Sequence, residues 1–343
     1  MGEPIKVLIV DDSMVFRSFL LRELSDFDDI NIIGTAASAA DAEEKIKSLK
    51  PQVVTLDVEM PGMNGIDFLK SSAVIRGLPV IVITSTPTST FEALSAGAVD
   101  FAKKPVMESR QDIKRFASRL HDMIVNARSA KPAAGRSTAV RRPIVQQGSF
   151  HTAPKKNAII ALGASTGGTD ALVEVVKHFP ADTPPVLIVQ HMPAGFTKMY
   201  AARLDKECEM SCKEAEDGDR LVPGQMIVAA GEFHLRLEKD AMGYYITSRR
   251  GEKVSGHCPS VDVLFESVAK TAGSDAVGAI LTGMGADGAE GLLKMRNAGA
   301  YTIGQNEETC VVYGMPCVAY KKGAVVKQLP LNEIGREILS KVR

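Results

Sequence analysis

Short apolar runs alternate with helical patterns along the first part of the chain, and this alternation constrains the fold more than any other feature of the sequence. Between the runs, apolar residues such as Phe16, Leu20 and Leu24 recur at roughly the spacing of a helical turn. Strands that alternate with helices form a parallel sheet with helices on both faces. We therefore predict a parallel five-stranded sheet with strands over residues 5–10, 30–35, 53–57, 80–84 and 98–101.

The same alternation returns in the second half of the chain. Patterns of buried strands cover 158–162, 186–190 and 276–281. A chain of 343 residues has room for two domains of about 150 residues each. We predict a first domain over 1–127 and a second, doubly wound α/β domain over 157–343.

The segment 128–156 between the two predicted domains differs from both in charge. It holds seven basic residues and no acidic one, whereas 1–127 and 157–343 carry net charges of −4 and −3. It is rich in Ala, Ser, Pro and Gly without a sustained apolar period, which is typical of a flexible linker. A patch that binds nucleic acid or an acidic partner is the alternative, but its one aromatic ring, Phe150, offers little surface for stacking.

The composition excludes several classes of protein. Lys plus Arg and Asp plus Glu both number 41, so the chain lacks the basic excess of a dedicated nucleic-acid binder. No apolar run approaches the roughly 18 residues of a membrane span, and the N-terminus lacks the apolar stretch of a signal peptide. Five cysteines are too few for a disulfide framework and fit a reducing compartment. We therefore expect a cytoplasmic protein that neither binds nucleic acid nor inserts into a membrane.

Polar side chains follow the predicted strands of the first domain at the points where the strands end. These side chains are Asp11, Asp12, Asp57, Thr84 and Lys104. The carboxyl ends of parallel strands meet at one edge of the sheet, which is where ligands bind. Three carboxylates at that edge repel one another unless a cation joins them, and oxygen ligands suit Mg²⁺. For Asp11 and Asp12 alone, the alternative is that they cap the first helix.

At these positions the segment 4–127 resembles the receiver domain of response regulators. The matching stretches are VLIVDDS (7–13), VTLDVEMPGMNG (54–65), IVITS (81–85) and FAKKP (101–105). The resemblance implies a flavodoxin-like fold, phosphorylation of Asp57, and a Mg²⁺ ion that serves this phosphorylation.

The same resemblance implies roles for the residues around Asp57. The residues implied to hold Mg²⁺ are Asp11, Asp12, Asp57 and, through its backbone carbonyl, Glu59. Thr84 and Lys104 would contact the phosphoryl oxygens, and Phe101 occupies the position of an aromatic switch. An aspartyl phosphate adds about two negative charges and strong hydrogen-bond acceptors at one point, which Thr84 and Lys104 can detect.

A glycine-rich turn follows the first predicted strand of the second domain. The stretch GASTGG (163–168) lies between that strand and a helical pattern, and it places Ser165 in a Gly-x-Ser-x-Gly pattern. Such a turn presents a serine hydroxyl as a nucleophile, and the N–H groups of the following helix favour an oxyanion beside it. The alternative is a dinucleotide loop, but the spacing differs from Gly-x-Gly-x-x-Gly and no ribose-binding acid lies in 189–191.

Two further strand ends supply a base and an acid. His191 directly follows the strand 186–190, and Asp287 lies in the loop after the strand 276–281. Ser, His and Asp at neighbouring strand ends form the set used in nucleophilic hydrolysis, in which the acid orients the histidine. The alternatives are a surface histidine and an aspartate that caps the helix 289–297. The chain order Ser–His–Asp differs from that of α/β-hydrolases, so we do not expect that fold.

Metal catalysis is the rival explanation for the second domain. The sequence lacks the pattern His-Glu-x-x-His. Cys208 and Cys212 lie about one helical turn apart and could join His257 and Cys258 in a zinc site. We expect ordinary reduced thiols instead.

From 157 to 343 the chain resembles the catalytic domain of the CheB family, the chemotaxis protein-glutamate methylesterases. The matching stretches are GASTGG (163–168), QHMPAGFT (190–197), PSVDVLFESVA (259–269), ILTGMGADG (280–288) and IGQNEETCVVYGMP (303–316). The resemblance implies Ser165 as nucleophile, His191 as general base and then acid, and Asp287 as its orienting partner. It also implies that backbone N–H groups near Thr166 and Met284 stabilise the oxyanion.

The resemblance further implies an activity and partners. The activity is hydrolysis of glutamate γ-methyl esters on methyl-accepting chemotaxis receptors with release of methanol, together with deamidation of receptor glutamines. A chemotaxis histidine kinase would supply the phosphoryl group, and ester hydrolysis would need no cofactor. Two departures from the family pattern concern receptor docking, because Cys258 and Cys317 stand where the family has an arginine and a basic residue. The alternative function is a receptor-binding adaptor that phosphorylation controls without catalysis.

Overall fold

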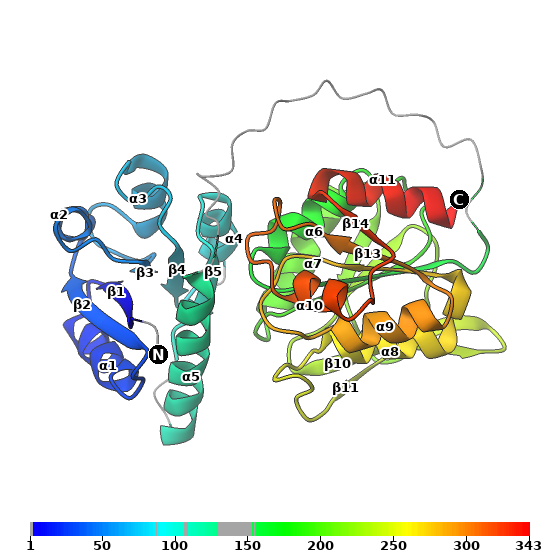
Figure 1. Ribbon diagram of the computed structural model, residues 1–343, viewed down its shortest axis with the longest axis horizontal. Coiled ribbons are helices and arrows are strands. Elements are labelled where there is room, and N and C mark those ends of the chain that lie inside the picture. The colour runs from blue at the N-terminus through cyan, green and yellow to red at the C-terminus, as the bar shows by residue number, and fades with distance from the viewer. Residues whose placement is uncertain (1–2, 87, 106–108, 129, 131–152, 154) are drawn as a thin grey trace. The chain divides into compact units, whose positions relative to one another are not determined.

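The computed structural model describes residues 3–343 except 87, 106–108, 129, 131–152 and 154 (Figure 1). The chain divides into two compact units, residues 1–141 and 142–343. Most of the predicted linker 128–156 lies outside the described residues, so its boundaries stay a prediction. No helix in the described part of the chain is long and apolar enough to cross a membrane.

The first unit is a parallel sheet of five strands in the order β2-β1-β3-β4-β5, which confirms the predicted flavodoxin-like α/β fold. The strands are β1 (Ile5–Val10), β2 (Ile30–Ala36), β3 (Val53–Asp57), β4 (Val80–Thr84) and β5 (Asp100–Lys103). The helices are α1 (Met14–Leu24), α2 (Ala39–Leu49), α3 (Gly65–Ser71), α4 (Thr88–Ser95) and α5 (Arg110–Ala127). Strand β5 begins later than predicted, because the Ala98 N–H still bonds to the carbonyl of Ala93 in the turn after α4.

Side-chain caps begin most helices of this unit. At α1, the hydroxyl of Ser13 accepts the N–H of Phe16, and Ser38, Asn64 and Ser109 cap α2, α3 and α5 in the same way. Each such cap stabilises a helix by about 1 kcal/mol. The cap of α1 is therefore Ser13, and the alternative that the two preceding aspartates cap this helix is wrong.

The second unit is a parallel sheet of seven strands in the order β14-β13-β12-β6-β7-β9-β8, with a separate antiparallel hairpin, β10-β11. The strands are β6 (Ile159–Ala164), β7 (Val186–Gln190), β8 (Ser211–Glu214), β9 (Gln225–Val228), β10 (Phe233–Asp240), β11 (Gly243–Arg250), β12 (Ala276–Ile280), β13 (Tyr301–Gln305) and β14 (Lys327–Leu329). The helices are α6 (Gly168–Val176), α7 (Phe196–Glu207), α8 (Val261–Thr271), α9 (Ala289–Asn297), α10 (Met315–Lys321) and α11 (Leu331–Val342).

The strand order of this sheet reverses between β6 and β12, which confirms the predicted doubly wound fold. From β6 the chain continues to β7 on one side, and from β12 it continues to β13 on the other. In open parallel sheets, ligands bind outside the carboxyl ends of the strands at such a reversal. The loops that follow β6, β7 and β12 meet there, and they carry Ser165, His191 and Asp287.

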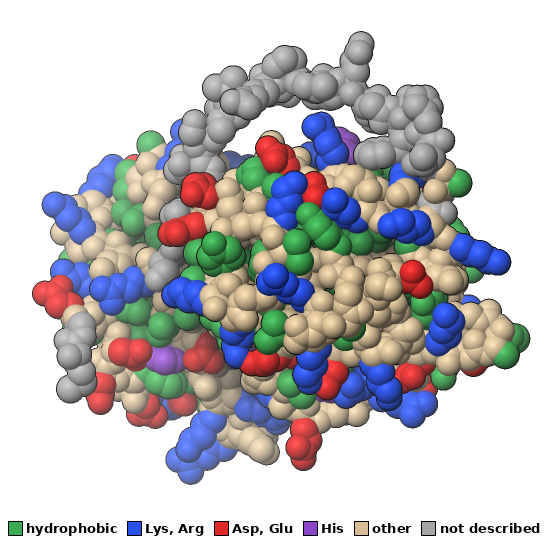
Figure 2. Space-filling model, turned by 45° about the vertical axis from the view of Figure 1, so that its right-hand side comes forward, with side chains coloured by type: hydrophobic (Ala, Val, Ile, Leu, Met, Phe, Trp, Pro, Cys, Tyr) green, Lys and Arg blue, Asp and Glu red, His purple; other side chains and the backbone are tan. Residues whose placement is uncertain are grey.

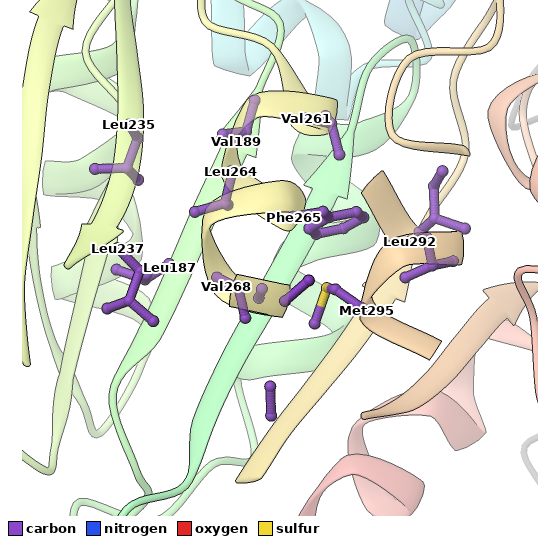
Figure 3. Close-up of a cluster of buried hydrophobic side chains, with 14 of the residues drawn as sticks. Leu187, Val189, Leu235, Leu237, Val261, Leu264, Phe265, Val268, Leu292 and Met295 are labelled. Atoms are coloured by element: carbon purple, nitrogen blue, oxygen red, sulfur yellow. The ribbon is translucent and has the colours of Figure 1, made fainter. Parts of the chain in front are cut away.

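Helix α8 lies at the centre of the hydrophobic core of the second unit (Figure 3). On one side it packs against the β10-β11 hairpin, and on the other against α9. The labelled core residues are Leu187, Val189, Leu235, Leu237, Val261, Leu264, Phe265, Val268, Leu292 and Met295. This packing fixes the position of α8, whose first turn lies beside the loop after β12.

Charged side chains of both signs are interspersed on the face shown in Figure 2. Blue Lys and Arg side chains and red Asp and Glu side chains both occur across that face. The mixture agrees with the equal numbers of acidic and basic residues, 41 of each.

Phe265 is fully buried in the core around α8. We expect Phe265→Ala to lower the free energy of unfolding of the second unit by about 3–5 kcal/mol, because it removes an aromatic ring and leaves a cavity. Met242, between β10 and β11, is 80% exposed. Met242→Ala should therefore change the same quantity by less than about 0.5 kcal/mol.

The measurement is urea unfolding followed by tyrosine fluorescence. All six tyrosines lie between residues 200 and 320, so this signal reports the second unit alone. A loss for Phe265→Ala as small as that for Met242→Ala would show that α8 is not the centre of this core.

Candidate active site and phosphorylation site

Three carboxylates gather at the carboxyl ends of β1 and β3 in the first unit. One oxygen from each of Asp11, Asp12 and Asp57 lies within 4.8 Å of the others. Asp11 and Asp57 are buried, whereas Asp12 is exposed. Lys104, which follows β5, donates a hydrogen bond of 2.7 Å from Nζ to Asp57 Oδ2 and lies 2.9 Å from Asp11 Oδ2.

Burial makes Asp57 an unusual carboxyl group. Its pKa is raised from 3.8 to about 6: burial raises it most and the negative charge of Asp11 adds to this, whereas the hydrogen bonds from Lys104 and the Glu59 N–H lower it. For Lys104, burial lowers the pKa, but its bonds to the two carboxylates prevail and the pKa is raised. One lysine thus contacts two buried carboxylates, and an exposed third carboxylate lies beside them. This set of hard oxygen donors with an excess of negative charge fits a divalent cation such as Mg²⁺.

Of the other residues predicted around Asp57, Thr84 and Glu59 lie at the same edge of the sheet, whereas Phe101 lies within β5. Thr84 ends β4 and is buried, and its hydroxyl accepts a hydrogen bond of 3.1 Å from the Thr86 N–H. Phe101 is buried in β5. The Glu59 N–H donates to Asp57 Oδ1 at 3.1 Å, and the Glu59 carboxylate accepts a bond from the Thr86 hydroxyl. The latter contact has no signal in the sequence, because it joins two loops at the ends of different strands.

Ser165 lies in the turn between β6 and α6 in the second unit. It is half-buried, and its N–H donates a hydrogen bond of 3.0 Å to the carbonyl of Thr282 in the loop after β12. Gly167 has a φ of 75°, and a Cβ there would lie 2.3 Å from Val311 Cγ2. Only glycine satisfies both constraints, so the turn that presents Ser165 depends on Gly167.

His191 lies beside Ser165 because the strands that precede them are paired. Ala164 of β6 is in register with Gln190 of β7, and the His191 N–H donates a hydrogen bond of 3.2 Å to the carbonyl of Ala164. His191 Nε2 lies 2.7 Å from Asp287 Oδ2. A carboxylate only accepts hydrogen bonds, so Nε2 carries the proton and Nδ1 carries the lone pair of the neutral ring. Nδ1 is buried and has no hydrogen-bond partner among the described residues.

Asp287 is a buried carboxylate surrounded by donors. Its Oδ1 accepts hydrogen bonds from Ser260 Oγ at 2.7 Å and the Asp262 N–H at 3.0 Å, and its Oδ2 accepts one from the Val261 N–H at 2.8 Å in addition to His191. Burial raises its pKa, but the bonds from His191, Ser260 and Asp262 outweigh this effect and lower the pKa below 3.8. Asp287 therefore stays ionised, partly because it faces the positive end of α8.

The sequence does not reveal the donors that surround Asp287. A serine directly before the apolar pattern 261–269 is a signal for a helix start at Ser260, and Ser260 does cap α8. That signal gives the position of the N-terminus of α8, but it does not show that this N-terminus faces the carboxylate of Asp287. The partner of the helix end depends on how α8 packs against the loop after β12.

The predicted oxyanion donors occupy two loops that are tied to each other. Thr166 directly follows Ser165, and Thr282 Oγ1 donates a hydrogen bond of 3.0 Å to the Thr166 carbonyl. Met284 is half-buried in the loop after β12. The backbone N–H group of Thr166 therefore comes from the turn that holds Ser165, and that of Met284 comes from the loop after β12. Their role in stabilising an oxyanion stays a prediction.

The zinc alternative finds no support in the described part of the chain. There, a group of three or more potential metal ligands is found at Asp11, Asp12 and Asp57, and not at the cysteines. Burial raises the pKa of Cys208 to about 11 and that of Cys212 to about 12, and nearby acidic side chains add to both shifts. Both thiols therefore stay protonated near neutral pH, whereas zinc binds thiolates. The ring of His257 stacks on that of His191.

Comparisons with known proteins match a different family to each of the two compact units. The family model for the response regulator receiver domain matches residues 7–115, and the model for CheB methylesterase matches residues 160–338. The protein-glutamate methylesterase/protein-glutamine glutaminase 2 of Syntrophomonas wolfei subsp. wolfei is 50% identical over 335 residues, which cover 97% of this chain and 96% of that protein. The protein-glutamate methylesterase/protein-glutamine glutaminase of Escherichia coli K12 is 42% identical over 344 residues, which cover 98% of this chain and 97% of that protein.

A solved structure agrees with these matches. The crystal structure of the CheB methylesterase catalytic domain of Thermotoga maritima aligns with a TM-score of 0.53 at 36% sequence identity. The alignment covers 54% of this chain and 99% of that domain. The second unit therefore corresponds to a domain that has been solved by itself.

The raised pKa of Asp57 gives a prediction for the first unit in the absence of divalent metal. Between pH 4 and pH 6 the folded carboxyl group holds a proton that the unfolded one has lost, so the stability of the unit falls as the pH rises through this window. Above pH 6 the Asp57 carboxylate is ionised in the folded state, and its buried charge lowers the free energy of unfolding of the unit by the full amount. We therefore expect Asp57→Asn to stabilise this unit at pH 7 and to have a much smaller effect near pH 4.5.

The measurement is hydrogen exchange of peptides from β1 and β3, in EDTA, with protection corrected for the intrinsic exchange rate at each pH. Asp26→Asn, which changes an exposed aspartate of the same unit, is the matched control. Equal protection of the Asp57→Asn protein and the unmodified protein at pH 7 would contradict the assignment of a destabilising charge to Asp57.

Proposed function

The chain belongs to the family of CheB methylesterases that carry a response regulator receiver domain, and we propose that Ser165, His191 and Asp287 perform the hydrolytic chemistry of that family. The protein is a protein-glutamate methylesterase and protein-glutamine glutaminase, and its receiver domain subjects receptor demethylation and deamidation to control by phosphorylation. The single observation that carries the proposal is the 2.7 Å contact between His191 and a buried, ionised Asp287 at the strand end next to Ser165.

The first half of the reaction forms an acyl-enzyme. Ser165 Oγ attacks the carbonyl carbon of the glutamate γ-methyl ester while His191 Nδ1 accepts the hydroxyl proton. The tetrahedral intermediate collapses when the resulting imidazolium returns this proton to the methoxy oxygen, so methanol leaves and the glutamyl group stays on Ser165. Water then attacks the acyl group with His191 again as base, which releases the glutamate carboxylate and restores the serine. With a glutamine side chain, the leaving group is ammonia.

Backbone N–H groups of Thr166 and Met284 stabilise the negative oxygen of the tetrahedral intermediate in this proposal. The positive end of α6, which begins three residues after Ser165, adds to their effect. Fixed donors of this kind contribute the largest single share of catalysis in many hydrolases.

Asp287 orients His191 and stabilises the imidazolium. Its lowered pKa keeps the carboxylate ionised throughout the reaction, so the proton from Ser165 stays on the histidine. The three donors from Ser260, Val261 and Asp262 prevent the carboxylate from turning away from His191.

The receiver domain controls this activity through Asp57 in our proposal. A chemotaxis histidine kinase donates the phosphoryl group to the Asp57 carboxylate. Asp11, Asp12 and Asp57, with the backbone carbonyl of Glu59, would hold Mg²⁺, which neutralises the oxygens of the phosphodonor when it is bound.

Phosphorylation adds negative charge and hydrogen-bond acceptors at Asp57. The Nζ of Lys104 exchanges its carboxylate contact for the phosphoryl oxygens, and the buried hydroxyl of Thr84 turns from Thr86 toward them. Phe101 lies on β5, directly after β4 in the sheet, and responds to that movement. Receptors that carry the methylated glutamates are the substrate. We place the reaction in the cytoplasm because the five cysteines are free thiols, which fits a reducing compartment.

The nucleophile gives the first test of the catalytic assignment. We expect Ser165→Ala to lower methanol release from methylated receptor membranes by more than about 10³-fold, because no other hydroxyl takes its place. Asp287→Asn should leave more activity than Ser165→Ala, since the aspartate orients the base and does not react. Ammonia release from receptor glutamines should fall in parallel with methanol release in Ser165→Ala.

Ser274→Ala is the matched control, because Ser274 is an exposed serine of the same unit and should leave both rates unchanged. Methanol release by Ser165→Ala at a rate near that of the unmodified protein would exclude Ser165 as nucleophile. Ammonia release that persists in Ser165→Ala while methanol release is lost would assign deamidation to another site.

Phosphorylation gives the second test. With Mg²⁺ and a small phosphodonor, methanol release by the unmodified protein should rise by about tenfold or more, which requires a difference of about 1.4 kcal/mol between the two states of the receiver. Asp57→Ala should stay at the basal rate, and Asp26→Ala should respond fully. EDTA should abolish the rise without lowering the basal rate, because the metal serves the receiver and not the ester hydrolysis. Full activation of Asp57→Ala would show that the phosphodonor acts elsewhere.

A further inference from the structure

The ring of His257 lies flat against the ring of His191. The two ring centroids are 3.7 Å apart and the planes differ by 9°. His257 is half-buried and lies in the segment between β11 and α8. Nothing in the catalytic scheme above uses this second histidine, although it contacts the proposed base over the whole face of the ring.

The backbone of His257 is held by a tight turn. The Val254 N–H donates a hydrogen bond of 3.0 Å to the His257 carbonyl, and the His257 N–H donates one of 2.9 Å in return. The two residues between them, Ser255 and Gly256, have φ values of 52° and 82°, as a two-residue turn of this kind requires. Ser255 Oγ also donates a hydrogen bond of 3.1 Å to Asp262 Oδ2 in the first turn of α8. The position of His257 is therefore tied to the start of α8.

The same short segment supplies the donors that hold Asp287. Ser260 follows His257 by three residues, and its hydroxyl bonds to Asp287 Oδ1. Residues 254–262 thus contact both members of the base–acid pair. They contact Asp287 through hydrogen bonds and His191 through a ring face.

These two kinds of contact constrain different motions of His191. The hydrogen bond from Nε2 to Asp287 fixes one edge of the ring but leaves rotation about the axis of that bond. A flat aromatic surface at 3.7 Å blocks this rotation, because tilting the ring would drive its edge into the neighbour. With the plane fixed, the Nδ1 lone pair keeps one direction. Misplacement of a reacting group by about 1 Å can cost about 10²-fold in rate.

We propose that His257 is a positioning residue that fixes the plane of the His191 ring by stacking, and so aims Nδ1 at the nucleophile. This inference rests on the proposed function, in which His191 is the base that activates Ser165. What His257 contributes is its flat ring, so another flat ring should replace it. A side chain of similar size without a flat face should not.

The test compares His257→Phe with His257→Leu in the full-length protein, with methylated receptor membranes as substrate. Both side chains fill the space, but only Phe offers a planar face. We expect His257→Leu to lower kcat by about 10- to 100-fold with little change in KM, and His257→Phe to stay within about threefold of the unmodified protein. His178→Ala, which removes an exposed imidazole from the same unit, should leave kcat unchanged.

A spectroscopic readout separates failure of this inference from failure of the proposed function. In protein labelled at the histidine ring carbons, the His191 ring protons, assigned with His191→Ala, should show an upfield ring-current shift in the unmodified protein and in His257→Phe. That shift should be lost in His257→Leu. If Ser165→Ala keeps its activity, the proposed function fails whatever the spectra show.

If Ser165→Ala is inactive, two results would each overturn the role of His257. One is a kcat for His257→Leu equal to that of the unmodified protein. The other is a kcat for His257→Phe as low as that for His257→Leu, which would show that the planar face is not what matters. A His257→Leu protein whose His191 ring protons keep their upfield shift would likewise show that the stack is absent in solution.

Discussion

The interaction on which the second unit depends is the contact of one buried carboxylate with the start of one helix. Asp287 comes from the loop after β12, and three of its hydrogen bonds come from the first residues of α8 and its cap, Ser260. Without these donors, burial would raise the pKa of Asp287, and a protonated acid would no longer stabilise an imidazolium. The helix end thus keeps the acid ionised at a place from which water is largely excluded. The fourth bond, to His191, then fixes which nitrogen of the base carries the proton.

The two units use buried aspartates at strand ends in opposite ways. Asp57 lies beside a second buried carboxylate, Asp11, and the lysine that they share does not offset the cost of burial, so the pKa is raised to about 6. Asp287 lies beside a helix end and a histidine, and its pKa is lowered. The first arrangement carries a surplus of negative charge that a cation can relieve. In the second arrangement, the helix start and His191 already stabilise the negative charge of Asp287. This suits a carboxylate that stays ionised throughout the reaction.

The sequence predicts the carboxyl ends of the strands well because short continuous apolar runs mark where buried strands stop. That is why Asp57, Ser165 and His191 could be selected before the structure, and why both sheets have the predicted α/β form. The short strands at and next to the edges of the seven-stranded sheet are different: β8, β9 and β14 have three or four residues each, too few to give a clear apolar run. The stacking of His257 on His191 cannot be predicted from the sequence, for another reason. It joins loops that are more than sixty residues apart in sequence, and only the packing of α8 brings them together.

The close approach of α8 to the sheet depends on residues that have no side chain. A Cβ at Gly163, in β6, would lie 2.2 Å from Val261 Cγ1, and a Cβ at Gly288, directly after Asp287, would lie 2.5 Å from the same atom. Val261 is also the residue whose N–H donates to Asp287. A larger residue at either glycine would push the first turn of α8 outward, and the distance from Val261 N to Asp287 would grow with it. Gly163 lies at the start of the glycine-rich turn before Ser165, and it also affects Asp287. Because Gly163 has no side chain, Val261 fits against β6. The first turn of α8, whose N–H groups keep Asp287 ionised, can therefore reach the edge of the sheet where Ser165 lies.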